Sequence, residues 1–278
     1  RPPSGLPVSA PPAPHTVSFV DGIDGLRVVV LVDRSGSMDL EGRLESAKLG
    51  AKQFVNLLSI GDGIGVASFE TGAAVNLPLR TITGDTDKAA AKNAVDAIAL
   101  GASTNIGGGL LKALEQLTSQ ANRSCNEIIV LLSDGDHNTG TSPDSVIPDL
   151  QREGVTVFTI GLGASLSTSG EATLQRIASS TGGRYFRSPT SFNLAGIFNA
   201  LAGETAGAGL LTRAPRTTAP NQTTKVPVPV EANTGKATFA LSFASPSDAF
   251  TLSLRTPSGQ LITGKGTNVD VIDEGNTI

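Results

Sequence analysis

Residues 27–37 read Arg-Val-Val-Val-Leu-Val-Asp-Arg-Ser-Gly-Ser. The first six residues form a continuous, mostly β-branched run of the kind that is buried on both faces of a parallel sheet. This run is followed directly by an acidic residue, Asp33, and then by two hydroxyl side chains, Ser35 and Ser37. The stretch therefore predicts a central strand whose carboxyl end carries a group of oxygen donors.

Two more apolar runs, at residues 128–132 and 155–160, resemble the first. Apolar residues recur at helical spacing between and after them, over residues 44–58, 110–121 and 174–178. Strands that alternate with helices predict an α/β fold with a doubly wound, mostly parallel sheet that is covered by helices on both sides. Residues 63–69 and 73–82, separated by a short turn, predict an antiparallel hairpin at one edge.

The two ends of the chain have a different composition. Residues 1–15 contain six prolines and predict an extended linker. Beyond a Gly-, Ala-, Thr- and Pro-rich stretch, apolar residues alternate strictly between turns, which predicts a small antiparallel β-sandwich. We therefore divide the chain into a linker (1–15), an α/β domain (16–205) and a sandwich (206–278). Only about five strands can be counted in the last part, where sandwiches of this kind have about seven, so we expect it to be incomplete.

Composition excludes several classes of function. The formal net charge of −4 gives no reason to propose a nucleic-acid partner, and no apolar run reaches the roughly 18 residues needed to span a membrane. The single cysteine, Cys125, excludes an internal disulfide and a cysteine-based zinc cluster. The chain opens on Arg1 rather than Met, so we expect it to be a piece of a longer protein.

Three segments far apart in the sequence supply the donors of one candidate metal site. The donors are Asp33, Ser35, Ser37, Thr104 and Asp134. All of them are oxygen ligands, the preference of a hard dication such as Mg²⁺. In an open α/β sheet, loops at the carboxyl ends of neighbouring strands converge, so we expect these residues to meet. Only two of the donors carry charge, which would leave the metal electrophilic toward a carboxylate arriving from outside.

The same residues also allow other interpretations. Each Asp, Ser or Thr taken alone is an ordinary helix-capping residue, and only the whole set favours a metal site. The two histidines, His15 and His137, cannot form a His-Glu-x-x-His protease helix. The sequence also lacks a Gly-x-x-x-x-Gly-Lys phosphate loop and a Gly-x-Ser-x-Gly nucleophile elbow. The sequence therefore indicates a binding site and no enzyme.

The Asp-x-Ser-x-Ser motif at 33–37, together with Thr104 and Asp134, resembles the metal-ion-dependent adhesion site (MIDAS) of von Willebrand factor A (VWA) domains. The resemblance covers about residues 17–205. Short segments are similar to the calcium-activated chloride channel regulator family, in which a β-sandwich follows the A domain. These segments are residues 17–19, 33–38, 43–44, 65–69, 180–183 and, in the sandwich, 254–259.

The resemblance implies a doubly wound domain that binds Mg²⁺, Mn²⁺ or Ca²⁺. It implies direct coordination by Asp33 and both serines, alternating with water-mediated coordination by Thr104 or Asp134. Residues 39 and 40 are Asp-Leu rather than two acids, so an adjacent second metal site is not expected. His137 lies near the expected site and would either tune ligand binding with pH or be a solvated loop histidine.

These observations predict a metal-dependent adhesion or binding module, extracellular or on the cell surface. Its partner would be a protein that presents an Asp or Glu carboxylate, with no nucleic-acid partner and no membrane insertion in this segment. The alternative is a regulatory subunit beside an ATPase, or an accessory region of a larger hydrolase. The sandwich favours the first interpretation, because it resembles an accessory module of surface proteins.

Overall fold

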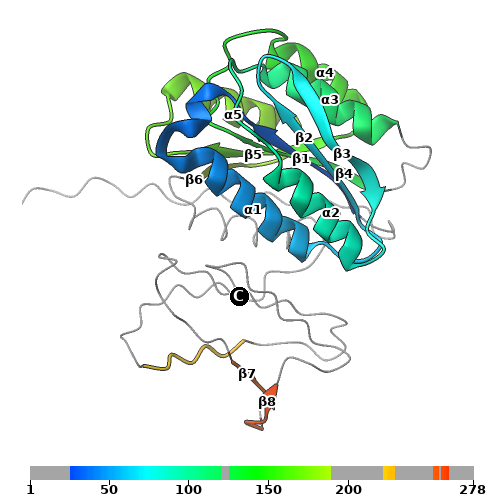
Figure 1. The fold of residues 1–278 in the computed structure, drawn as a ribbon, viewed down its shortest axis with the longest axis vertical. Helices are drawn as coiled ribbons and strands as arrows, with labels where there is room; N and C mark the ends of the chain where they lie inside the picture. The colour runs from blue at the N-terminus through cyan, green and yellow to red at the C-terminus, as the bar shows by residue number, and fades with distance from the viewer. Residues whose placement is uncertain (1–25, 120–124, 189–221, 229–252, 257, 263–278) are drawn as a thin grey trace, which may run out of the picture.

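A computed structural model of the chain describes residues 26–119, 125–188, 222–228, 253–256 and 258–262 (Figure 1). The first two ranges form an α/β domain built on a six-stranded sheet. In strand order the sheet reads β3-β2-β1-β4-β5-β6, and every neighbouring pair is parallel except β2 with β3. The strands are β1 (Leu26–Asp33), β2 (Gly63–Phe69), β3 (Ala73–Thr81), β4 (Asn126–Ser133), β5 (Thr156–Leu162) and β6 (Tyr185–Ser188).

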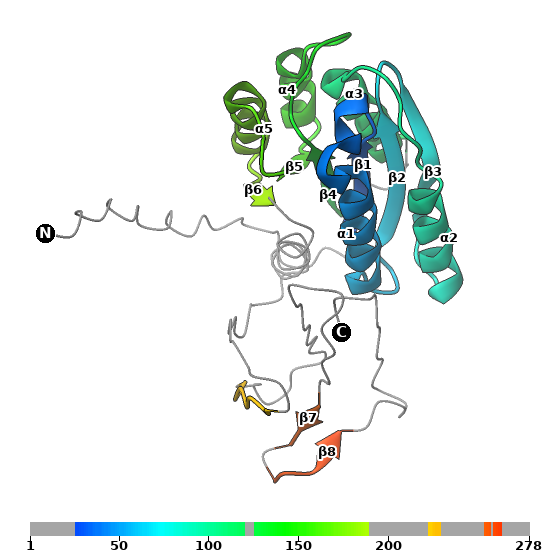
Figure 2. The same cartoon turned by 60° about the vertical axis from the view of Figure 1, so that its left-hand side comes forward.

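Helices cover both faces of this sheet, which confirms the predicted doubly wound fold. Helices α1 (Arg43–Leu57) and α2 (Asp85–Asp96) pack on one face. Helices α3 (Ile106–Thr118), α4 (Pro143–Arg152) and α5 (Thr168–Ser180) pack on the other. Figure 2 shows α1 and α2 side by side, with α4 and α5 together elsewhere on the domain. A short 3₁₀ segment, η1 (Gly36–Gly42), links β1 to α1.

The position of β1 inside the sheet explains why polar and apolar residues do not alternate along it. Val28, Val30 and Val32 belong to the core on the α1–α2 side, and Val29 and Leu31 belong to the core on the other side. All five side chains are completely buried. Each burial of this kind contributes about 1.5–3 kcal/mol. The central strand is therefore a rigid base for the residues that follow it.

Two helices were not expected from the hydrophobic pattern. Only Ala91 and Val95 of α2 are buried, so its apolar stripe is too narrow to give a clear helical period. Helix α4 contains Pro148, a residue that normally breaks a helix, although Pro143 occupies a favourable position in its first turn. The predicted antiparallel edge hairpin is confirmed by β2 and β3.

The described residues near the C-terminus include one small antiparallel hairpin, β7 (Leu254–Arg255) with β8 (Leu261–Ile262). Its connection is closed by a hydrogen bond from Gly259 N to Thr256 O of 2.8 Å. The linker at 1–15, the boundary near 205 and most of the predicted sandwich over 206–278 lie outside the described residues, so these assignments stay predictions. None of the helices formed by the described residues is long and apolar enough to cross a membrane.

Candidate metal centre

The candidate site lies at the point where the strand order of the sheet reverses. From β1 the chain moves outward through β2 to β3, and it then returns to the other side of β1 to form β4, β5 and β6. Asp33 is the last residue of β1, and Asp134 directly follows β4. Because β1 and β4 are parallel neighbours, both carboxylates lie at the same edge of the sheet. Open α/β sheets bind their ligands at this switch point.

Asp33 is completely buried and accepts two hydrogen bonds. Its Oδ1 accepts from the Ser35 backbone N–H at 2.8 Å, and its Oδ2 accepts from Ser133 Oγ at 2.6 Å. Burial raises the pKa of Asp33 to about 7, although both hydrogen bonds oppose the rise. The nearby Asp134 charge adds a smaller contribution in the same direction as burial. The Asp33 carboxyl is thus oriented by its neighbours and lacks the solvation that normally keeps it charged.

The two serines of the motif lie at the start of η1, where Ser35 directly precedes the segment and Ser37 is its second residue. Ser35 is buried, Ser37 is half-buried, and their Oγ atoms are 3.2 Å apart. Between them, Gly36 N donates to Ala102 O at 2.8 Å. Gly101 N in turn donates to the backbone oxygen of Arg34 at 2.6 Å. The first loop of the site is therefore hydrogen-bonded to the loop that carries Thr104.

Thr104 connects that second loop to the third. Its side chain is buried, its backbone N–H donates to Asn138 Oδ1 at 2.9 Å, and its carbonyl accepts from Asn138 N at 3.0 Å. Asn105 N donates to Glu70 O at 2.8 Å, which fixes the same loop to the end of β2. Backbone hydrogen bonds thus hold all three predicted segments at one edge of the sheet.

Asp134 differs from Asp33 in its partners. It is buried, and its Oδ2 accepts from Arg43 Nη1 at 2.9 Å. Its Oδ1 is also buried, and it has no hydrogen-bond partner among the described residues. Gly135 then turns the chain away with a φ of +83°, and a Cβ there would lie 2.5 Å from Gly170 O. Only glycine suits both this backbone conformation and this close approach.

Two residues outside the motif contact its carboxylates. Ser133 holds Asp33, and Arg43 holds Asp134. Ser133 directly precedes Asp134, and its position at the end of a buried strand is the one sequence feature that indicates a role at the site. Arg43 is 91 positions from Asp134 in the sequence and looks like an ordinary helix start, yet only 5% of its surface is exposed. The low exposure is visible only in the folded chain.

The donor set fits a hard dication. It consists of two carboxylates and three hydroxyls, with no nitrogen or sulfur, as Mg²⁺ and Ca²⁺ prefer. An unbonded, buried carboxylate oxygen such as Asp134 Oδ1 needs a proton donor, a water or a cation. Within the described ranges, no group of three or more His, Cys, Asp or Glu residues could hold a metal, and the candidate site itself combines only two carboxylates with hydroxyls.

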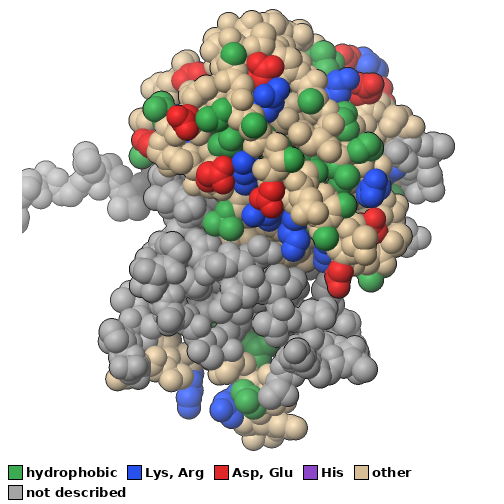
Figure 3. Space-filling view, in the orientation of Figure 1, with side chains coloured by type: hydrophobic (Ala, Val, Ile, Leu, Met, Phe, Trp, Pro, Cys, Tyr) green, Lys and Arg blue, Asp and Glu red, His purple; other side chains and the backbone are tan. Residues whose placement is uncertain are grey.

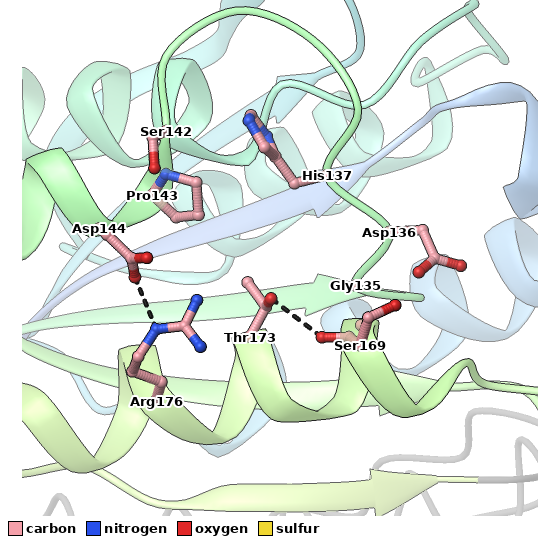
Figure 4. A pocket seen from close by; sticks show the side chains of 10 residues that line it. Gly135, Asp136, His137, Ser142, Pro143, Asp144, Ser169, Thr173 and Arg176 are labelled. Atoms are coloured by element: carbon pink, nitrogen blue, oxygen red, sulfur yellow. Dashed lines mark hydrogen bonds and ion pairs between the residues drawn. The ribbon is translucent and has the colours of Figure 1, made fainter.

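A polar pocket of about 200 Å³ begins at Gly135 (Figure 4). On its floor Arg176 Nε contacts Asp144 Oδ1 at 2.6 Å. His137 lines the pocket and is half-buried, and its Nδ1 is buried with no hydrogen-bond partner among the described residues. His137 is thus a partly buried loop histidine, and a role in tuning ligand binding with pH stays a prediction. The neighbouring acid, Asp136, is exposed.

The family model of the von Willebrand factor type A domain matches residues 28–200. The chain belongs to this family. The match covers every strand of the six-stranded sheet except the first residues of β1, and it includes all five predicted metal ligands.

Known proteins similar to this VWA domain differ widely in source. Calcium-activated chloride channel regulator 1 of Equus caballus is 32% identical over 179 residues, which are 64% of this chain and 18% of that protein. The chain thus spans less than a fifth of that relative. The solved von Willebrand factor type A structure from Catenulispora acidiphila has a TM-score of 0.59 and 25% identity, over 66% of this chain and 43% of the other.

A further solved structure shares the fold at 23% identity and a TM-score of 0.56, over 65% of this chain and 48% of the other. It is proximal thread matrix protein 1 from the mussel byssus, with a zinc-occupied MIDAS motif.

Proposed function

We propose that this VWA domain binds one divalent cation and uses it to hold a protein ligand through an Asp or Glu carboxylate. Mg²⁺ is the proposed ion, with Mn²⁺ and Ca²⁺ as alternatives. The ligands would be Asp33, Ser35, Ser37, Thr104 and Asp134. The observation that carries the proposal is the Oδ1 atom of Asp134, which is buried at this site without a hydrogen-bond partner among the described residues.

The preference for a cation follows from the charges. Asp33 and Asp134 are both buried at one edge of the sheet, and buried carboxylates need a proton or a cation near them. Arg43 contacts Asp134 through Oδ2, which leaves the buried Oδ1 of Asp134 without a partner among the described residues. The hydroxyls of Ser35 and Ser37, 3.2 Å apart, add neutral oxygens to the same place. The zinc-occupied MIDAS of the mussel protein, which shares this fold, supports occupancy by a dication.

The preference for an anionic ligand follows from incomplete neutralisation. A dication held here would supply strong attraction for an anionic oxygen, since three of its five protein ligands are neutral. Ser37 is half-buried, so the site opens to solvent on its side. Two apolar side chains are exposed nearby in the sequence: Leu40 of η1 (58% exposed) and Leu100 (43%), which directly precedes the loop that carries Thr104. They would add apolar contacts around the carboxylate of a protein partner.

We further propose that the module is non-catalytic and acts outside the cell or at its surface. Acidic and basic side chains are interspersed on the face of the α/β domain shown in Figure 3. A field of one sign, which would attract nucleic acid or an anionic membrane, is not seen on that face. The chain's kinship with the chloride channel regulators and its VWA fold support a role in protein recognition.

Ser37→Ala is expected to weaken ligand binding about tenfold, because it removes one neutral oxygen from the cation's coordination shell. The probe is a displayed library of short random peptides, selected on the immobilised domain with Mg²⁺ present. Retained peptides should be enriched in Asp and Glu and should be released by EDTA.

Ser46→Ala is the matched control, since Ser46 is a half-buried serine on α1 outside the site. It should bind the selected peptides as the wild type does. Peptides that stay bound in EDTA, or that bind equally to Ser37→Ala, would show that recognition occurs on another surface.

A further inference from the structure

Arg43 is a buried cation in direct contact with the candidate metal centre. Its surface is 5% exposed, and its Nη1 donates to Asp134 Oδ2 at 2.9 Å. Its Nη2 donates to Ser165 Oγ at 2.8 Å and to Glu41 Oε2 at 3.2 Å. The guanidinium therefore joins the start of α1, the end of β4 and the loop after β5.

The surroundings hold this guanidinium in one place. Glu41 is itself fixed, because it accepts hydrogen bonds from Ala164 N at 3.0 Å and from Ser165 Oγ at 3.1 Å. A Cβ at Gly163 would lie 2.4 Å from Arg43 Nε, so the backbone of the loop packs directly against the side chain. Arg43 is thus held in place by hydrogen bonds to Asp134, Glu41 and Ser165.

We propose that Arg43 is a built-in counter-ion of the metal centre, which compensates Asp134 in the metal-free protein and limits the affinity for the dication. The proposal rests on the proposed function, since it assigns Asp134 to the cation site. Arg43 is a positioning residue in this account, because it acts through Asp134.

The compensation of Asp134 in the metal-free protein follows from burial. The Asp134 side chain is 3% exposed, and a buried carboxylate without a counter-ion is strongly disfavoured. Glu41 shares the guanidinium, but its side chain is 41% exposed, so water screens its charge. The positive charge of Arg43 therefore acts mainly on Asp134, and it allows the empty site to stay folded.

The limited affinity for the dication follows from the positive charge of Arg43. A dication beside Asp134 would be repelled by the fixed guanidinium on the other oxygen of that carboxylate. Asp134 consequently contributes less than a full negative charge to the cation. The bound ion then keeps enough positive charge to need an anionic ligand, which makes ligand binding and metal retention depend on each other.

An orienting role alone would give the opposite result on mutation. If Arg43 only aimed the carboxylate, its loss would misplace Asp134 and weaken metal binding. If Arg43 is a counter-ion, its loss strengthens metal binding while it destabilises the metal-free protein. The sign of the change in metal affinity separates the two roles.

The experiment is calorimetric titration of Mn²⁺ into the wild type, Arg43→Gln and Arg43→Lys. We expect Arg43→Gln to bind Mn²⁺ about tenfold more tightly, because a unit positive charge near the dication is removed. Arg43→Lys keeps the charge and should stay close to the wild type. Without metal, Arg43→Gln should melt at a lower temperature than the wild type, and saturating Mn²⁺ should restore most of the difference.

Arg27→Gln is the matched control. Arg27 contacts Glu127 at 3.8 Å. Both residues lie at the starts of their strands, β1 and β4, and thus at the ends away from the site, so the substitution should leave the Mn²⁺ affinity unchanged. Unchanged or weaker Mn²⁺ binding by folded Arg43→Gln would overturn the proposal. A wild type that binds no Mn²⁺ would instead contradict the proposed function.

A double variant keeps the test decisive if Arg43→Gln does not fold without metal. Arg43→Gln combined with Asp134→Asn removes both charges of the pair, so it should be more stable without metal than Arg43→Gln alone. Equal instability of the single and double variants would overturn the counter-ion role, whatever the metal affinity.

Discussion

Asp134→Asn is expected to lower the affinity for Mg²⁺ or Mn²⁺ at least about a hundredfold, the largest effect of any single change at the site. The substitution removes one of two negative charges while it keeps the shape of the side chain and an oxygen that can accept from Arg43. It should leave the sheet intact, because the core on both faces of β4 is unaffected. It is also expected to lower the stability of the protein, because the buried Arg43 loses its charged partner. Calorimetric titration measures the loss, and far-UV circular dichroism checks the fold.

Asp136→Asn provides the control for this prediction. Asp136 lies two positions further along the same loop, but it is exposed and bonded to Ser167 Oγ. Its substitution makes the same chemical change outside the site and should alter metal affinity less than about twofold. Equal metal affinity in Asp134→Asn and the wild type would remove Asp134 from the site.

The metal-free protein is expected to lose stability as the pH rises from 4 to 8, through Asp33. The pKa of this carboxyl is about 7 in the folded chain and near 3.8 when unfolded, so the folded state holds a proton between these values that the unfolded state has released. The contribution is therefore fully present below about pH 3.8 and is lost as the pH rises through about 7. A shift of this size corresponds to about 4 kcal/mol.

Chemical denaturation of the wild type and Asp33→Asn at several pH values isolates this effect, because the variant has no proton to lose at that position. Between pH 4 and pH 8, the unfolding free energy of the wild type should fall relative to that of Asp33→Asn. Added Mg²⁺ should oppose the loss near pH 8, since metal binding favours the deprotonated carboxylate. A difference that is constant with pH would show that Asp33 titrates normally.

Much of the α/β domain could be predicted from its sequence because the central strands are buried on both faces. A strand in that position must be apolar at nearly every residue, which makes runs such as 28–32 and 128–132 easy to recognise. Their carboxyl ends then had to meet at one edge, so the polar residues after them could be assigned to one site. The weakly apolar helix α2 and the proline-containing α4 gave no comparable signal.

The charge balance of the site could not be predicted in the same way. It depends on contacts between distant segments, such as Arg43 with Asp134 and Ser133 with Asp33. An arginine at a helix start is usually solvated, and nothing near Arg43 in the sequence indicates a buried partner. Burial and pairing arise only when α1, β4 and the loop after β5 come together. The sequence therefore indicated the candidate donors, and the fold was needed to find the buried cation, Arg43, that pairs with one of them.

The most direct test of the proposed metal centre is a crystal structure of the domain grown with Mn²⁺ and an acidic peptide, with anomalous scattering recorded at the manganese edge. We predict one strong anomalous peak at the carboxyl ends of β1 and β4, within coordination distance of oxygens from Asp33, Ser35 and Ser37. A carboxylate oxygen of the peptide should complete its coordination. Manganese bound only elsewhere, or a peptide bound away from the ion, would contradict the account.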